Sequence, residues 1–144
     1  MRQLSFYCGD YQAALKYFNA NNPNSHMEKL TQDLQTGDQM VEETRQYIGS
    51  FLDNTLITYG AFWNQETSPL YLFSNCEFVF NTLRLLVAEG KLDRNQVNIL
   101  YFEDKDANSP HMGLMIGKNG QLNCWPYGFF DTMGKLLTRL MELR

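Results

Sequence analysis

The pattern of apolar and polar residues in the second half of the chain predicts two buried strands joined by a helix. Leu70–Phe73 and Val97–Phe102 are short apolar runs, typical of strands that are covered on both faces. Between them, residues 77–90 place apolar side chains on one broad face at helical spacing, and Gly90 is the expected terminating residue. This order predicts a βαβ unit with a right-handed crossover and parallel pairing of its strands.

Residues 1–60 have a mainly helical pattern. A short strand is predicted over residues 1–9, where it ends at a glycine, and the aspartate that follows supplies a helix N-cap. A Ser-x-x-Glu capping box opens a further helix. The predicted helices of this part follow Asp10, run from Ser25 to about Leu34, and begin at Asp38.

After the second apolar strand, the sequence predicts a β-hairpin and a last helix. Gly117–Gly120 contains an Asn-Gly pair, which accepts positive φ at both turn positions, between the segments 112–116 and 121–124. The last helix is expected over residues 131–142. We therefore predict an α/β fold: a small sheet with a parallel βαβ core and a C-terminal β-hairpin, packed by four or five helices.

The composition favours a folded protein. The chain has 144 residues, of which 44% are hydrophobic and 19% charged, which excludes a disordered or coiled-coil chain. This length fits one domain, residues 1–144, with a mainly helical part over 1–60 and an α/β part over 61–144. The net charge of −4 argues against a broad nucleic-acid-binding surface.

The sequence has no pattern typical of a signal peptide, a membrane span or a cysteine-based site. The first residues lack the apolar region of a signal peptide, and no apolar stretch has the length needed to cross a bilayer. Cys8, Cys76 and Cys124 are odd in number and far apart, which disfavours a disulfide framework or a zinc site. We expect a protein of the reducing cytoplasm that does not contact the membrane.

An acidic group directly follows the second predicted core strand: Glu103, Asp104 and Asp106. Ligands of open α/β sheets bind at the carboxyl ends of strands, so these acids could hold Mg²⁺ in a small metal-dependent hydrolase or nuclease. Turns are also commonly rich in Asp, Asn and Ser, and a solvated turn explains the same residues. Without a further acidic motif, the turn is the favoured interpretation, and we expect no metal ion or other cofactor.

Other candidate sites have structural interpretations that suit them better. His26 and His111 are the only imidazoles, and neither lies in a recognisable nucleophile signature with a cysteine. The glycines at 117 and 120 join two predicted strands, whereas a phosphate loop requires GxxxxGK[ST] between a strand and a helix. A basic group on the last helix could serve a nucleic-acid adaptor, or could complement the helix dipole. This group consists of Lys135, Arg139 and Arg144.

Several segments between Pro69 and Leu143 resemble one family in order and spacing. The family comprises the RecF-like and overcoming-lysogenization-defect-like AAA ATPases of the ABC/SMC type, whose chains end in a small domain with a Trp-Pro-x-Gly-Phe-Phe-Asp segment. The matching segments here are Leu70 to Phe73, Ser74 to Glu77, Asn81 to Leu85, Ala88 to Leu92, Val97 to Phe102 and Trp125 to Asp131.

The departures from this family bear on function. The position of the family's switch histidine, which contacts the nucleotide, is Asn75 here, and the phosphate-binding loop has no counterpart. Hydrolysis of ATP by this chain alone is therefore not expected.

The resemblance implies a non-catalytic accessory module for a larger ATPase of the SMC/ABC type, in bacterial DNA repair or anti-phage defence. Nucleic acid would be contacted only indirectly, and self-association is left open. The residues expected at the protein interface are Asn75, Trp125, Tyr127, Phe129 and Phe130.

Overall fold

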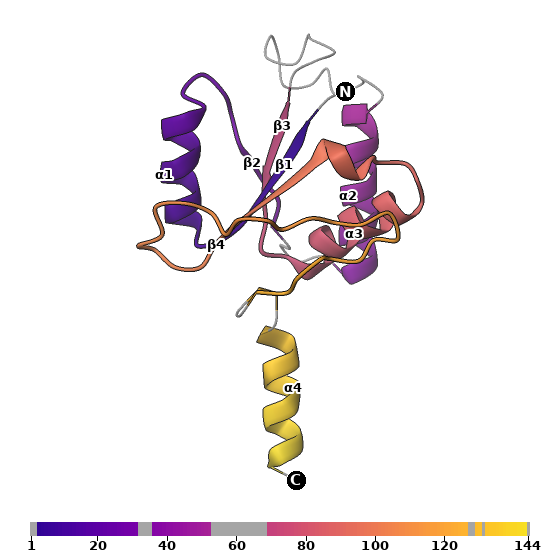
Figure 1. Cartoon of the computed structure of the whole chain (residues 1–144). Helices are drawn as coiled ribbons and strands as arrows, with labels where there is room; N and C mark the ends of the chain where they lie inside the picture. Colours follow the sequence, from indigo (N-terminus) through magenta and orange to yellow (C-terminus); the bar gives the residue numbers. More distant parts are fainter. Residues whose placement is uncertain (1–2, 32–35, 53–68, 127–128, 131, 144) are drawn as a thin grey trace.

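A computed structural model describes residues 3–31, 36–52, 69–126, 129–130 and 132–143. Strands and helices alternate along the chain (Figure 1). The strands are β1 (Leu4–Gly9), β2 (Glu28–Lys29), β3 (Leu70–Phe73) and β4 (Val97–Phe102). The helices are α1 (Tyr11–Asn21), α2 (Gly37–Leu52), α3 (Glu77–Ala88), the short 3₁₀ helix η2 (Arg94–Gln96) and α4 (Thr132–Glu142).

The described strands form one parallel sheet in the order β2-β3-β1-β4. The predicted α/β class and both predicted core strands are confirmed. The two strands of the predicted βαβ unit run parallel as expected, but their predicted direct pairing is wrong, because β1 lies between β3 and β4 and pairs with both. Leu4 is opposite Leu70 on one side and Val97 on the other. The N-terminal strand is thus the centre of the sheet.

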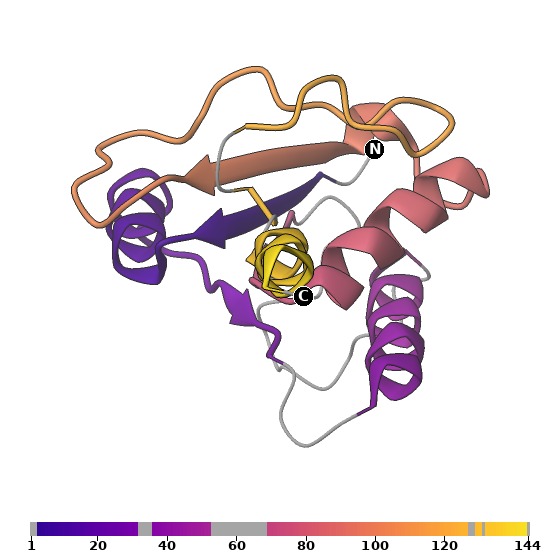
Figure 2. The same cartoon turned by 90° about the horizontal axis from the view of Figure 1, so that it is seen from below.

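Two apolar layers cover the two faces of this sheet (Figures 1 and 2). Alternate residues of β1 face opposite layers: Phe6 and Cys8 belong to the larger core with α2 and α3, whereas Tyr7 packs with Phe18 of α1. The Tyr7 and Phe18 rings meet edge to face with centroids 5.8 Å apart. Alternation in one strand therefore places α1 on one face and the α2–α3 pair on the other.

One predicted helix is wrong. Residues 25–27 are irregular, and Glu28–Lys29 forms the edge strand β2, where the capping-box pattern predicted a helix to Leu34; residues 32–35 lie outside the described part. The box that operates is Thr36 with Gln39: the Gln39 amide donates to Thr36 Oγ1 at 3.2 Å, and the Thr36 amide to Gln39 Oε1 at 3.0 Å. This pair of hydrogen bonds caps the start of α2, whose first residue is Gly37.

The predicted C-terminal hairpin is not confirmed as regular strands. A single antiparallel bridge joins Ile116 to Leu122, and the Gly117 amide donates to the Gln121 carbonyl at 2.7 Å. Gly120 has φ +81°, whereas Asn119 lacks the positive φ expected at both turn positions, so that part of the prediction is wrong. The Gly120 amide donates to the Gly117 carbonyl at 2.9 Å, and the Asn123 amide to the Met115 carbonyl at 3.0 Å. The segment is therefore a hydrogen-bonded turn without regular strands beside it.

The last helix, α4, projects away from the edge of the sheet (Figure 1). It is amphipathic, and its apolar side chains are exposed. Among the described helices, none combines the length and apolar character that crossing a membrane requires.

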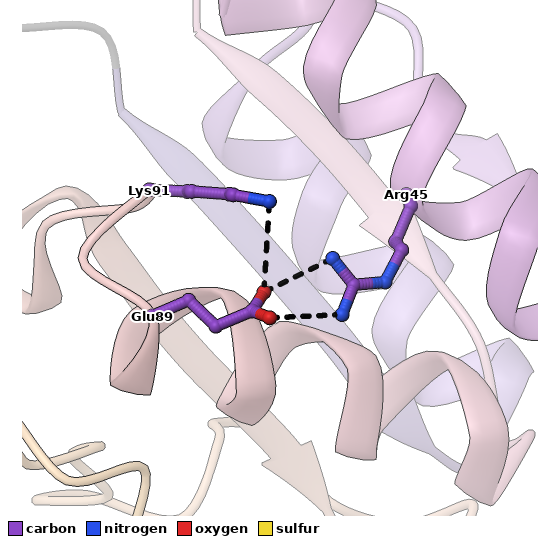
Figure 3. Close-up of polar contacts among 3 residues, drawn as sticks. All are labelled: Arg45, Glu89 and Lys91. Atoms are coloured by element: carbon purple, nitrogen blue, oxygen red, sulfur yellow. Dashed lines mark hydrogen bonds and ion pairs between the residues drawn. The ribbon is translucent and has the colours of Figure 1, made fainter.

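An ion pair ties the end of α3 to the outer side of α2 (Figure 3). The Arg45 guanidinium donates to both oxygens of Glu89, at 3.0 and 3.2 Å, and Lys91 Nζ lies 4.0 Å from Glu89 Oε1. The hydrogen bonds from Arg45 hold the pKa of Glu89 below its usual value and raise the pKa of Arg45. These side chains are solvent-screened, so the pair contributes little and is sensitive to salt.

We predict that Glu89→Gln lowers the stability of the fold slightly at neutral pH and low salt, and has no effect in acid. Because the pKa of Glu89 is lower in the folded state, its contribution is present above the unfolded pKa and is lost as the pH falls through the folded pKa. Urea unfolding at several pH values and salt concentrations measures this. Glu142→Gln, which removes the exposed Arg139–Glu142 pair of α4, is the matched control and should change nothing. An equal loss in both variants would contradict the assignment.

Candidate functional site

The carboxyl ends of β1 and β3 form the point where the sheet changes the direction of its connections. The chain leaves β1 to form α1 on one face, whereas it leaves the neighbouring β3 to form α3 on the other face. Connections that diverge in this way leave a crevice at the strand ends, where open α/β sheets bind their ligands. Gly9 and Asp10 lie at the end of β1, and Asn75 follows β3.

Asn75 joins the two strand ends through the backbone of Gly9. The Gly9 amide donates to Asn75 Oδ1 and Asn75 Nδ2 donates to the Gly9 carbonyl, both at 2.7 Å. The Asp10 amide then donates to the Phe102 carbonyl of β4 at 3.0 Å. Both polar atoms of the Asn75 side chain are engaged in this contact, so its role is to fix the frame of the crevice.

A cavity of about 380 Å³ opens at these strand ends. The turn after β1 lines it with Gly9 and Asp10, and the end of β4 with Tyr101 and Glu103. Asp10 also caps α1, because its Oδ1 accepts from the Ala13 amide at 3.0 Å. The size is that of small-ligand sites.

Aromatic rings from the Trp-Pro segment close the remaining side. Phe130 stacks on Phe80 of α3 with centroids 4.8 Å apart and an angle of 5° between the planes, and Phe129 stands perpendicular to Phe130. Phe130 has φ +48°, a left-handed conformation that is strained for a bulky residue. Packing on Phe80 holds this conformation, and thereby the cavity wall.

The predicted interface residues have different environments. Phe129 is fully buried and belongs to the core, and Phe130 is half-buried. Trp125 is 48% exposed, with its ring edge-on to Phe129 and the Arg84 guanidinium 5.6 Å above it. Tyr127 lies outside the described residues. Their role as an interface stays a prediction.

The predicted acidic group lies together beside a second cavity of about 420 Å³ near His111, which all three acids line. Glu103 also lines the cavity at the strand ends, whereas Asp104 and Asp106 do not. Asp104 Oδ1 accepts from the Asp106 amide at 2.9 Å, which is the hydrogen bond of an ordinary Asx turn. Within the described residues, no three or more His, Cys, Asp or Glu side chains are grouped to hold a metal ion. The hydrolase alternative stays a prediction.

The buried thiol of Cys8 is unsuited to nucleophilic catalysis. Its side chain is fully buried in the core behind the crevice, and burial raises the pKa of the thiol well above its ordinary value. The Sγ atom lies 3.9 Å from the Leu100 carbonyl of β4. Cys8 therefore acts as a small apolar residue of the central strand.

Sequence reasoning missed that Gly9, Asp10 and Tyr101 share a cavity with Asn75. The strand-Gly-Asp-helix pattern signals the turn after β1, but the sequence does not say that β1 lies between β3 and β4. Once this order is known, the residues that follow each strand meet at one edge.

The C-terminal third of the chain resembles a known family. Residues 92–140, about a third of the chain, match the sequence profile of a family described as a protein of unknown function (DUF3696), which is found in AAA-ATPase-like proteins. No curated protein and no solved structure matches the chain. The likeness to AAA ATPases is thus supported in this segment, whereas the kinship with RecF-like and overcoming-lysogenization-defect-like proteins stays a prediction.

We predict that Gly9→Ala destabilises the protein by at least about 2 kcal/mol. A Cβ there would lie 2.0 Å from the Phe102 carbonyl oxygen, and Gly9 has φ +92°. Gly49→Ala is the matched control: it lies inside α2 with no atom within 4 Å of the added Cβ, and should stabilise by about 0.5–1 kcal/mol. Chemical unfolding of both variants measures the difference. A Gly9→Ala protein as stable as the original chain would refute the close packing at this edge.

Asn75→Asp is expected to cost about 1–3 kcal/mol near neutral pH, because the carboxylate keeps the acceptor for the Gly9 amide but faces the Gly9 carbonyl without a donor. The cost should shrink in acid, where the protonated carboxyl can again donate to that carbonyl. Unfolding at pH 7 and pH 4 tests this, with Asn81→Asp on α3 as a control. A cost that does not depend on pH would argue against the reciprocal contact.

Proposed function

We propose that this chain is a non-catalytic accessory module that docks on a larger ATPase of the ABC/SMC type, related to the RecF-like and overcoming-lysogenization-defect-like proteins. The observation that carries the proposal is the uncovered apolar side of α4. Five large apolar side chains are between 54% and 69% exposed: Leu136, Leu137, Leu140 and Met141 in α4, and Leu143 directly after its end. Leu137, Leu140 and Met141 have the i, i+3, i+4 spacing that is part of the pattern by which helices enter grooves of partner proteins.

The match to a segment found in AAA-ATPase-like proteins supports the choice of partner. That match extends from the start of η2 through β4 and into α4 as far as residue 140. It therefore includes the projecting helix and the Trp-Pro segment before it. We infer that the helix meets the ATPase, and the proposed setting is bacterial DNA repair or anti-phage defence in the cytoplasm.

The free energy of burial, compared with the cost of association, indicates that contacts of the helix alone would give a weak complex. Burying the remaining exposed surface of the five side chains would contribute on the order of 5–9 kcal/mol. Association costs roughly 4–15 kcal/mol in lost motional freedom. A stable complex therefore needs further contacts beside α4. Trp125 and the crevice at the adjoining sheet edge offer them.

Leu140→Glu is predicted to prevent co-purification of an ATPase that carries a phosphate loop, whereas Thr138→Glu, on the opposite side of the same helix, should retain it. Both variants add the same charge to the projecting helix, and Leu140 is 60% exposed, so neither should disturb the core. The measurement is co-purification of the full chain from cells that naturally make it, with the bound proteins identified by mass spectrometry. The proposal would be contradicted if the original chain recovered no such ATPase, or if both variants recovered it equally.

A further inference from the structure

We propose that the cavity at the carboxyl edge of the sheet receives the guanidinium group of an arginine side chain from the docking partner. This inference rests on the proposed function, because the cavity adjoins the segment that leads into α4. Its walls come from Asp10 after β1, Glu103 after β4, and the paired rings of Phe129 and Phe130. The cavity of about 380 Å³ has room for a side chain and its end group.

The charge of the cavity selects a cation. Asp10 and Glu103 bring carboxylates from two different strand ends, and no Lys, Arg or His is among the described residues that line the cavity. The start of α1 would favour an anion, but a helix N-terminus carries only about half a positive charge, and Asp10 already caps it. A carboxylate offers about four acceptor sites, so capping one amide leaves Asp10 able to accept from a ligand. The two carboxylates outweigh the helix end.

The aromatic wall selects a planar organic cation over a metal ion. Of the aromatic residues that line the cavity, Phe130 is half-buried and offers accessible ring surface, whereas Tyr101 and Phe129 are buried, with ring centroids 5.1 Å apart. Guanidinium groups stack on aromatic rings and pair with carboxylates through a planar fork, and they are more weakly hydrated than ammonium groups. Among the described residues, no group of three or more metal-ligating side chains is present at this edge or elsewhere. Arginine is therefore favoured over both lysine and a divalent cation.

The walls are held rigidly before any partner arrives. The reciprocal contact of Asn75 with Gly9 fixes the end of β1 against that of β3, and the hydrogen bond from Asp10 to Phe102 fixes it against β4. Phe130 is locked on Phe80 in a left-handed conformation. A prearranged site binds with a smaller loss of conformational freedom, which suits a contact made by one side chain.

The test is an NMR titration of the full chain with Nα-acetyl-arginine amide, following the amide signals of Gly9, Asp10 and Glu103. We expect saturable shifts with a dissociation constant on the order of millimolar. The neutral citrulline analogue should give no saturable shift, and the lysine analogue should bind more weakly. Equal shifts with citrulline, or no saturation with arginine, would overturn the proposal. Free arginine binding more than about tenfold tighter than the capped form would also overturn it, because the ligand would then be an amino acid.

The double variant Asp10→Asn with Glu103→Gln should weaken arginine binding at least about tenfold while the protein stays folded, since asparagine also caps helices. Its matched control, Glu42→Gln with Asp93→Asn, removes the same charge from residues that do not line the cavity and should bind normally. Equal weakening in both double variants would show that only the overall charge matters, and would contradict the site.

The titration needs no partner. Lost arginine binding with intact ATPase co-purification would therefore refute this inference alone, and the reverse result would refute only the proposed function.

Discussion

The close approach of Gly9 to the end of β4 is the contact on which the rest of the structure depends. Only a residue without a Cβ fits there, because the Phe102 carbonyl oxygen would lie 2.0 Å from an added atom. The approach lets the Asp10 amide bond to that carbonyl, and Asn75 holds the same residue from the other side. One glycine thus brings three strand ends together, and the cavity follows from their meeting.

Most elements of the fold could be predicted from local signals, but the order of the strands could not. Residues 70–73 and 97–102 were predicted as strands and form them, because apolar side chains dominate both segments and most of these side chains are buried. The pattern at Ser25 and Glu28 favoured a helix, yet pairing with β3 made Glu28 part of an edge strand. Pairing with β3 overrode the short local preference, although Met27, Leu30 and Leu34 stand at helical spacing in the sequence.

The candidate site, like the fold, depends partly on local sequence and partly on contacts between residues far apart in the sequence. Asn75 was singled out because the sequence resemblance places a histidine of the resembling family at this position, and Glu103 because it follows a core strand. Asn75 and Glu103 line one cavity because β1 lies between the strands that precede them. Gly9 at the end of β1 is 66 residues away from Asn75 in the sequence. Phe129 and Trp125 looked alike in sequence, whereas packing buries the first and leaves the second 48% exposed. Local patterns name candidate residues, and topology decides which of them meet.

The sequence resemblance places a switch histidine at the position of Asn75, and the occupied side chain of Asn75 has a structural role here. A histidine that responds to a ligand needs a polar atom free to contact that ligand, whereas both polar atoms of Asn75 bond to the backbone of Gly9. Breaking that contact would remove two hydrogen bonds at the end of β1, although its backbone pairing with β3 would remain, so movement here would carry a cost. A rigid edge of this kind cannot act as a moving switch. In the proposed function it presents a fixed cavity beside an exposed apolar helix, and the two surfaces together bind a partner that each alone would bind too weakly.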